Sequence, residues 1–171
     1  STSLFSENNG GWVNENSDTT TSSFSNLSLW KGEQEVKKSG LNYSIVRFSG
    51  IYGPNRDFLI KKVKSYSARL KNYPSISNRI HQEDCVGILY HIASLENPKS
   101  LYIGSDDHPT EYNEVIKWIY KKLQLTPPIE KDLNKNKSTR HTNKKCSNQL
   151  IKESGYTFIF NDYKKGISSL L

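Results

Sequence analysis

The chain has 171 residues, 34% of them hydrophobic, so it is long enough for one packed core, although this apolar content is low for a compact enzyme domain. No apolar run approaches the length that crosses a bilayer and the opening residues carry no secretion signal, so we expect a cytoplasmic protein with no membrane partner. The net charge of +7 comes mainly from lysine, but the densest basic stretch, residues 131–145, has no aromatic side chain to stack on bases, which favours a solvated loop over a nucleic-acid or other polyanion site.

The first elements along the chain predict a helix that leads into a buried strand. Residues 6–25 are rich in Asn, Ser, Thr and Gly and are expected to form a long surface loop. Residues 28–38 have helical spacing, with Ser28 as a cap for the first turn and Gly40 placed to end the helix. Residues 45–48 show no clean two-residue alternation, which is typical of a central parallel strand covered on both faces.

A glycine-rich turn follows that strand. Gly50, Gly53 and Pro54 end the strand, and in an open parallel sheet ligands bind beyond the carboxyl ends of strands. Residues 49–56 are therefore the expected wall of a site. Tyr52 would present its ring to this crevice, although an ordinary packed tyrosine fits the sequence equally well.

The remaining elements alternate between helices and short strands. Helices are predicted over residues 58–70, 85–97, 111–123 and 148–154, a strand over 100–104, and a helical tail from 161. Asp84 and Thr110 occupy cap positions, and Gly155 closes the fourth of these helices. The apolar face predicted for residues 85–97 consists of Val86, Leu89, Ile92 and Leu95. With little hairpin signal, this order predicts an α/β protein.

Six segments of the chain, taken in order, resemble those of a known family. STSLF, WVNENS, GEQEVKKSGLNYSIVRFSGIYGP, NRIHQED, SLYIGSDDHPTEYNEV and KKCSNQLIKESGYTFIF look like the carboxyl-terminal portion of an extended or atypical short-chain dehydrogenase/reductase. In particular they are similar to the NAD(P)-binding, nucleoside-diphosphate-sugar epimerase/dehydratase-like proteins. The resemblance covers nearly all of the chain, and RFSGIYGP and RIHQED are its most specific parts.

The resemblance implies an α/β, Rossmann-like fold that lacks its amino-terminal nucleotide-binding half. No G-x-G-x-x-G occurs, the chain contains no methionine, and it opens directly on Ser-Thr-Ser, so we expect a fragment. Residues 1–57 would be the remaining part of the Rossmann-like core, and 58–171 a carboxyl-terminal substrate-side region interleaved with it. The implied cofactor is NAD or NADP, bound mainly by the missing half. The expected partner is a small-molecule substrate, and a homodimer is compatible with the resemblance.

The family's usual chemistry needs a tyrosine as general acid/base, a lysine four residues later that lowers the tyrosine pKa, and an upstream serine or threonine. By resemblance, Ser1 takes the place of the upstream serine, and the tyrosine and lysine positions fall on Ser25 and Leu29. A serine hydroxyl is too weak an acid for the first role, and leucine carries no charge for the second. The usual Tyr-x-x-x-Lys pair is therefore absent.

Three functions stay open at this point. The first is an epimerase, dehydratase or reductase that acts on a sugar nucleotide or similar small polar substrate, with His81, Tyr52 or Asp84 as an atypical acid/base. The second is a non-catalytic dinucleotide-binding sensor or scaffold of the same fold, and the third is a basic binding module unrelated to nucleotides. The expected site residues are Ser1 and His81 (catalytic), Ser49, Gly50 and Ile51 (cofactor), and Tyr52, Arg56 and Arg79 (substrate).

Plain structural roles compete with several of these assignments. Asp84 fits a helix cap, His81 fits a hydrogen bond to backbone, and Arg47 inside the predicted strand fits a buried ion pair. The two cysteines, Cys85 and Cys146, lack metal-site spacing, so we expect two free thiols in a reducing compartment and no metal centre.

Overall fold

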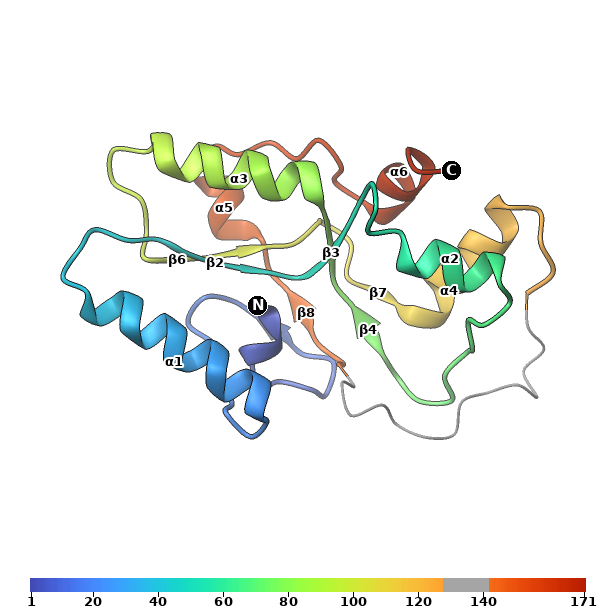
Figure 1. Cartoon of the computed structure of the whole chain (residues 1–171), viewed down its shortest axis with the longest axis horizontal. Helices are drawn as coiled ribbons and strands as arrows, with labels where there is room; N and C mark the ends of the chain where they lie inside the picture. The colour runs from blue at the N-terminus through green and yellow to red at the C-terminus, as the bar shows by residue number, and fades with distance from the viewer. Residues whose placement is uncertain (128–141) are drawn as a thin grey trace.

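The computed structural model describes residues 1–127 and 142–171, which form the α/β architecture predicted from the sequence (Figure 1). Parallel strand pairs lie between helices, as expected for strands that alternate with helices along a chain. Most of the lysine-rich stretch that was predicted to be a solvated loop, namely residues 131–141 of 131–145, lies outside the described residues. No helix in the described part of the chain is long and apolar enough to span a bilayer.

The central layer is the parallel pair β2 (Ile45–Phe48) and β6 (Leu101–Gly104), and both strands were predicted. Helix α1 (Phe24–Lys38) lies on one side of this pair, and α3 (Gln82–Ser94) and α5 (Gln149–Glu153) lie on the other (Figure 1). The prediction of full burial for β2 is wrong, because only Arg47 is buried. In the described residues β2 pairs with β6 alone, so its other three side chains are half-covered.

The strand pairing changes after β2, where the chain leaves β6 and pairs with a different strand. Ser49 still donates its backbone N–H to the Gly104 carbonyl at 2.9 Å, but β3 (Gly50–Tyr52) pairs in parallel with β5 (Arg79–His81) instead. A side chain at Gly50 would press on the Asn78 carbonyl, since a Cβ there would lie 3.0 Å from that oxygen. This change of pairing therefore depends on glycine, and it opens space at the carboxyl ends of the strands.

The remaining elements complete the two flanks of this layer. Strand β1 (Trp12–Val13) pairs in parallel with β8 (Lys145–Cys146), and β4 (Ile76–Ser77) pairs antiparallel with β7 (Thr110–Glu111). The other helices are the 3-10 turn η1 (Thr2–Leu4), α2 (Phe58–Lys64), α4 (Tyr112–Lys122) and α6 (Tyr163–Ser168).

Three apolar clusters hold the described residues together. Buried side chains of α2, α4 and α6 form the first cluster, including Val63, Ile119 and Ile167. The second packs α3 and α5 against β5 and β6, and a small third one lies around Phe5 and Ile103. The first cluster forms a unit beside the central layer, and a cavity lies where it meets the strand ends.

Several predicted helix boundaries are corrected by the structure. Helix α1 begins at Phe24, because Ser23 rather than Ser28 caps it, with its Oγ accepting from Asn26 N at 3.2 Å. Helix α2 ends at Lys64, and Tyr66 adopts a left-handed backbone conformation that stops it. Helix α4 follows the short strand β7, so Thr110 does not cap it. Gly40 and Gly155 do end their helices, at φ of 72° and 101°.

The face that α3 buries agrees with the prediction at Ile92, which is buried, but differs from it in the first half of the helix. Val86 and Leu89 are 68% and 52% exposed, whereas Asp84, Cys85 and Ile88 point into the protein. Asp84 is not the cap, since α3 starts at Gln82 and His81 precedes it. Its carboxylate instead accepts three hydrogen bonds, from Tyr156 Oη and from the backbone N–H groups of Ile159 and Phe160, at 2.8–2.9 Å. These bonds fix the rotation of α3.

Arg47 forms the buried ion pair expected from its place in the strand. Its Nε and Nη2 donate to the two carboxylate oxygens of Glu33 at 2.9 and 2.7 Å, a bidentate arrangement. Both side chains are at most 10% exposed, so the pair joins α1 to β2 away from water.

Candidate functional site

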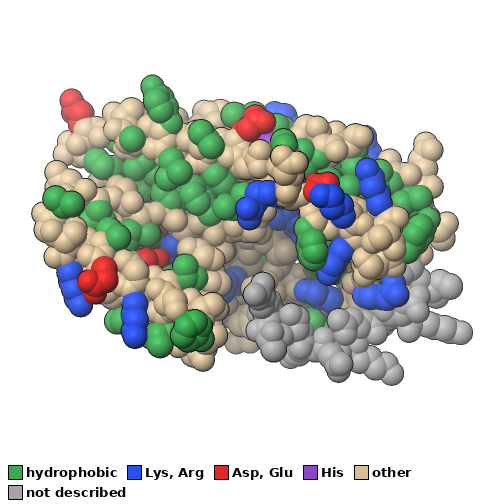
Figure 2. Space-filling view, viewed as in Figure 1, with side chains coloured by type: hydrophobic (Ala, Val, Ile, Leu, Met, Phe, Trp, Pro, Cys, Tyr) green, Lys and Arg blue, Asp and Glu red, His purple; other side chains and the backbone are tan. Residues whose placement is uncertain are grey.

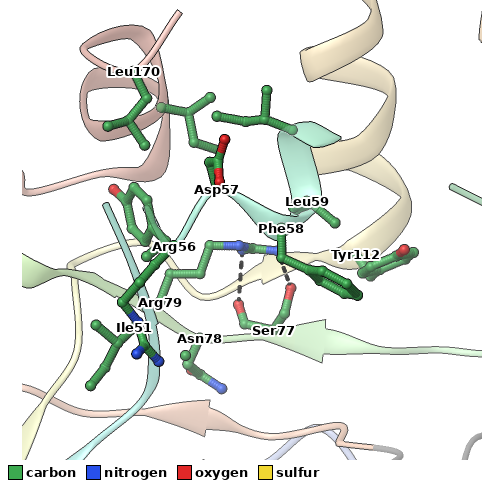
Figure 3. Close-up of a pocket in the computed structure, with 14 residues that line it drawn as sticks. Ile51, Arg56, Asp57, Phe58, Leu59, Ser77, Asn78, Arg79, Tyr112 and Leu170 are labelled. Carbon is green, nitrogen blue, oxygen red and sulfur yellow. Dashed lines mark hydrogen bonds between the residues drawn. The ribbon is translucent and has the colours of Figure 1, made fainter. Parts of the chain in front are cut away.

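A cavity of about 280 Å³ lies beside β3 and β5, enclosed by α2, α4 and α6 (Figure 3). Five of the predicted site residues line it: the three predicted for the substrate (Tyr52, Arg56 and Arg79) and two predicted for the cofactor (Gly50 and Ile51). The turn after β2 therefore forms part of a cavity wall, as the position beyond a parallel strand predicts.

Arg79 is the charged group that lies deepest in this wall. It is only 8% exposed, and its two terminal nitrogens donate to the Ser77 carbonyl at 3.4 Å and to Ser77 Oγ at 2.6 Å (Figure 3). The guanidinium also lies over the Tyr163 ring, 5.6 Å from its centroid. Burial lowers the Arg79 pKa, but an arginine stays charged in proteins. A positive charge is thus built into the cavity.

Asp106 is a buried carboxyl group close to Arg79, and it was not recognised in the sequence. It is 1% exposed, its backbone N–H donates to the Arg79 carbonyl at 2.7 Å, and its Oδ1 accepts from His108 N at 3.2 Å. Oδ2 has no hydrogen-bond partner among the described residues. Burial raises the Asp106 pKa to about 8. The His108 hydrogen bond and the Arg79 charge both lower this pKa, but their effect is smaller than that of burial.

Tyr52 points its hydroxyl toward α6. A Cβ at Gly166 would collide with that hydroxyl, so the glycine is what admits the ring. The oxygen is buried without a hydrogen-bond partner in the described part of the chain. Burial raises the Tyr52 pKa, and the nearby Asp106 adds to the effect, so the phenol stays protonated at neutral pH.

His81 lies behind Tyr52 rather than in the cavity wall. Its ring is 1% exposed and contacts the Tyr52 ring edge-on at 5.3 Å and the Phe160 ring at 4.0 Å. Nδ1 accepts from Glu83 N at 3.3 Å, which is the backbone hydrogen bond expected as its plain role. Nε2 has no partner among the described residues, and desolvation lowers the His81 pKa, so the neutral ring is favoured.

Arg56 is exposed at the rim of the cavity. Figure 3 shows its side chain extending toward Ile51, away from the hydrogen bonds that hold Arg79. Lysines in the last turns of α2 and α4 add to the basic side chains on this flank, part of which is seen in Figure 2. Arg56 therefore adds a positive charge at the rim to that of the buried Arg79 in the wall.

A second cavity of about 230 Å³ adjoins the first. Ser1, Ser49 and Gly50, all predicted site residues, line it with Thr142 and Lys144. Gly50, Ser77 and Asn78 belong to both cavity walls. The structure thus brings the predicted site residues together around two adjoining cavities, but Ile51, predicted for the cofactor, lines the first cavity with the predicted substrate residues.

Two features of this second wall are informative. Ser49 Oγ is buried without a hydrogen-bond partner among the described residues, so a polar ligand group would satisfy it. Lys144, 5% exposed, donates from Nζ to the Phe5 carbonyl at 2.6 Å, and burial lowers its pKa. The sequence had placed Lys144 in a solvated loop, and no local signal marks it as buried.

The positions where the resemblance places the tyrosine and lysine lie at the start of α1. This turn is fixed beside Ser1, because Asn26 exchanges hydrogen bonds of 3.0 and 3.1 Å with Ser3. Ser25 bonds only locally, with Ser23 Oγ at 3.2 Å, and Leu29 is 41% exposed. The helix is in place, but its side chains offer no acid or cation there. The described residues contain no cluster of three metal-binding side chains.

No protein-family model and no curated protein matches the sequence, but solved structures do. A protein of Methylobacillus flagellatus assigned to the NAD-dependent epimerase/dehydratases matches with a TM-score of 0.84 and 26% identity, over 99% of this chain and 60% of that one. A conserved protein of unknown function from Silicibacter pomeroyi gives 0.87 and 26%, over 99% and 63%. MoeE5, solved with UDP-glucuronic acid and NAD, gives 0.76 and 15%, over 97% and 60%.

These likenesses confirm the resemblance seen in the sequence. The chain has the Rossmann-like fold of the NAD-dependent epimerase/dehydratase proteins. The match covers 99% of this chain and so includes the residues that line both cavities. It spans about 60% of the length of the first of these structures, so the activity of a whole protein of that kind is a proposal for this chain.

Proposed function

We propose that the chain forms the substrate-side part of an NAD(P)-binding epimerase, dehydratase or reductase that acts on a sugar nucleotide or similar small polar substrate. The observation that carries this proposal is the pair of adjoining cavities that share Gly50, Ser77 and Asn78. Two ligands that react with each other must bring their reacting atoms to within about 3–3.5 Å, so their sites must adjoin.

The second cavity is the proposed place for the nicotinamide end of the cofactor. Ser49 and Gly50 line this cavity, and the unpartnered Ser49 Oγ fits the ribose or amide of NAD or NADP. Ile51, the third residue predicted for the cofactor, lines the first cavity instead. When bound, the nicotinamide would accept or return a hydride. Ser1 lines the same cavity, and we propose that it hydrogen-bonds the reacting oxygen.

The first cavity is the proposed substrate side. Arg79 and Arg56 would bind an anionic group of the substrate, and Tyr52, whose strand position is paired with that of His81, lines the same wall. His81 contacts Tyr52 but lines neither cavity, so its proposed contribution runs through the tyrosine. The catalytic roles of Ser1 and His81, the division of the chain at residues 57 and 58, the homodimer and the cytoplasmic location stay predictions.

A second function, a non-catalytic dinucleotide-binding sensor or scaffold, is favoured by one observation. By the resemblance, Ser25 and Leu29 occupy the positions of the usual acid/base and its lysine, and hydrogen bonds between Asn26 and Ser3 hold the start of α1 against the amino-terminal turn. Since Tyr52 stays protonated and His81 has no access to either cavity, the described residues provide no obvious replacement base.

The test uses the natural full-length protein with NAD or NADP and a panel of sugar nucleotides. Cofactor binding followed by formation of the reduced cofactor supports the enzyme, and binding without turnover supports the sensor. Ser49→Ala should weaken cofactor binding, because it removes the free hydroxyl, while Ser94→Ala at the exposed end of α3 should not. Failure to bind either cofactor would refute both functions.

A further inference from the structure

The wall of the first cavity is mainly apolar, with Ile51, Leu59, Ile167 and Leu170 among its residues. Its polar side chains are largely occupied by the protein itself. Ser77 Oγ donates to the Thr110 carbonyl at 3.0 Å and accepts from Arg79, so it offers no free donor.

The same holds for the other two small polar residues of the wall. Asn78 donates to the Lys144 carbonyl at 2.9 Å and accepts from Cys146 N at 2.8 Å. Asp57 forms an ion pair with Lys61 at 2.7 Å. A ligand rich in hydroxyl groups would therefore meet few unoccupied partners, and its own hydroxyls would lose hydrogen bonds to water.

Three polar side chains of the wall stay available to a ligand, namely Arg56 at the exposed rim, Tyr52 with its unpartnered hydroxyl, and Arg79. Arg79 is the buried charge among them. Ser77 takes two of the five N–H donors of its guanidinium, and no carboxylate of the described residues lies within 4.0 Å of it. Asp106 is the nearby acid, but burial raises its pKa to about 8 and so leaves it largely neutral at pH 7. A buried cation without a counter-charge is unfavourable and gains from an incoming anion.

We propose that this cavity binds a small organic anion with an apolar body: its single phosphate or carboxylate on Arg79, its ring or short chain against Ile51, Leu59, Ile167 and Leu170. The inference rests on the proposed function in taking this cavity as the substrate side, and among the small substrates proposed there it favours an anion with an apolar body over a hydroxyl-rich sugar nucleotide. The cavity volume of about 280 Å³ is just below the usual range for ligand pockets, about 300–1,000 Å³, which suits a ligand with a single ring.

The test is isothermal titration calorimetry of the chain at neutral pH with four probes. Phenyl phosphate and benzoate carry an apolar ring. Glucose 1-phosphate has the same phosphate ester group on a hydroxylated sugar ring, and inorganic phosphate has no organic group. Phenyl phosphate should bind at least about tenfold tighter than glucose 1-phosphate and inorganic phosphate. Comparison with benzoate shows whether phosphate or carboxylate is preferred.

Two variants separate the anionic contact from the apolar one. Arg79→Gln should weaken phenyl phosphate at least about tenfold, while Arg69→Gln, an exposed arginine outside the cavity, should not. Leu170→Trp places a larger ring in the cavity wall and should weaken phenyl phosphate while leaving inorganic phosphate unchanged. It provides an independent test because Leu170 is only half-buried.

Equal affinity for glucose 1-phosphate and phenyl phosphate, or no binding of phenyl phosphate at about 10 mM, a concentration at which any specific site would register, overturns the inference. The outcome is separable from the proposed function. If the protein binds phenyl phosphate but neither NAD nor NADP, the proposed function is refuted and the anion site in the first cavity is supported. If it turns over a sugar nucleotide but shows no selectivity for apolar anions, the proposed function is supported and the anion site is refuted.

Discussion

Asp106→Asn tests the electrostatics of the site through folding stability. The substitution removes one titrating group but keeps an oxygen to accept from His108 N, at 3.2 Å in the native protein. In the folded chain the Asp106 pKa is raised from 3.8 to about 8 by burial. Between these values the folded state holds a proton that the unfolded state releases, so Asp106 lowers stability increasingly as the pH rises.

The size of the effect follows from the pKa difference. At 1.36 kcal/mol per pKa unit, the rise from about pH 4 to pH 7 costs the native protein at most about 4 kcal/mol, which the asparagine variant does not lose. Urea unfolding of both proteins at a series of pH values measures the difference between their free energies of unfolding. All other titrating groups are present in both proteins, so their contributions cancel and the pH dependence of the difference comes from Asp106. The two proteins should have similar stability near pH 4, and the variant should be the more stable at pH 7.

Asp107→Asn provides a control of opposite sign. Burial raises the Asp107 pKa, but hydrogen bonds from Asn148 at 2.8 Å and Lys152 at 3.0 Å outweigh it and the net pKa is lowered. Asp107 therefore stabilises the fold above its unfolded pKa and loses that contribution as the pH falls. A stability difference between Asp106→Asn and the native chain that stays constant with pH would refute the reasoning about Asp106.

Three further predictions concern the packing around the site. Arg47→Met should cost about 3–5 kcal/mol in urea unfolding because it leaves Glu33 buried and unpaired, and a second change, Glu33→Leu, should recover much of that loss; no recovery would contradict the pairing argument. Asp84→Ala should destabilise by about 3 kcal/mol or more, since three donors lose their acceptor, and amide exchange should rise first in residues 156–160. Cys85 and Cys146, whose pKa burial raises to about 11, should react with a thiol reagent at least about 100-fold more slowly in the native chain than in urea, and equal rates would show that they are accessible.

Features set by neighbouring residues were predictable from the sequence. The helix, strand and turn from α1 to Pro54 follow from apolar spacing and glycine positions, and the prediction that residues 49–56 face a cavity depends only on where ligands bind in parallel sheets. The boundaries shifted where a second capping residue, such as Ser23, was available upstream.

Features set by contacts between distant segments were not predictable. The apolar residues of α3 fit two helical faces, and the choice between them is made by the bonds from Asp84 to residues 156–160, more than seventy positions away. The meeting of Asp106 with Arg79 depends in the same way on the pairing of distant strands. Neither acid carries a local signal that separates it from a surface carboxylate.

The partition between the two cavities has a thermodynamic consequence. Gly50, Ser77 and Asn78 each belong to both walls, so any shift of this backbone that improves the fit of one ligand also changes the shape offered to the other. The two occupants would then be energetically linked, and the factor by which the first alters the affinity for the second must equal the reverse factor. Order of addition would not affect the final complex, and the same coupling constant should emerge from titrations started at either side.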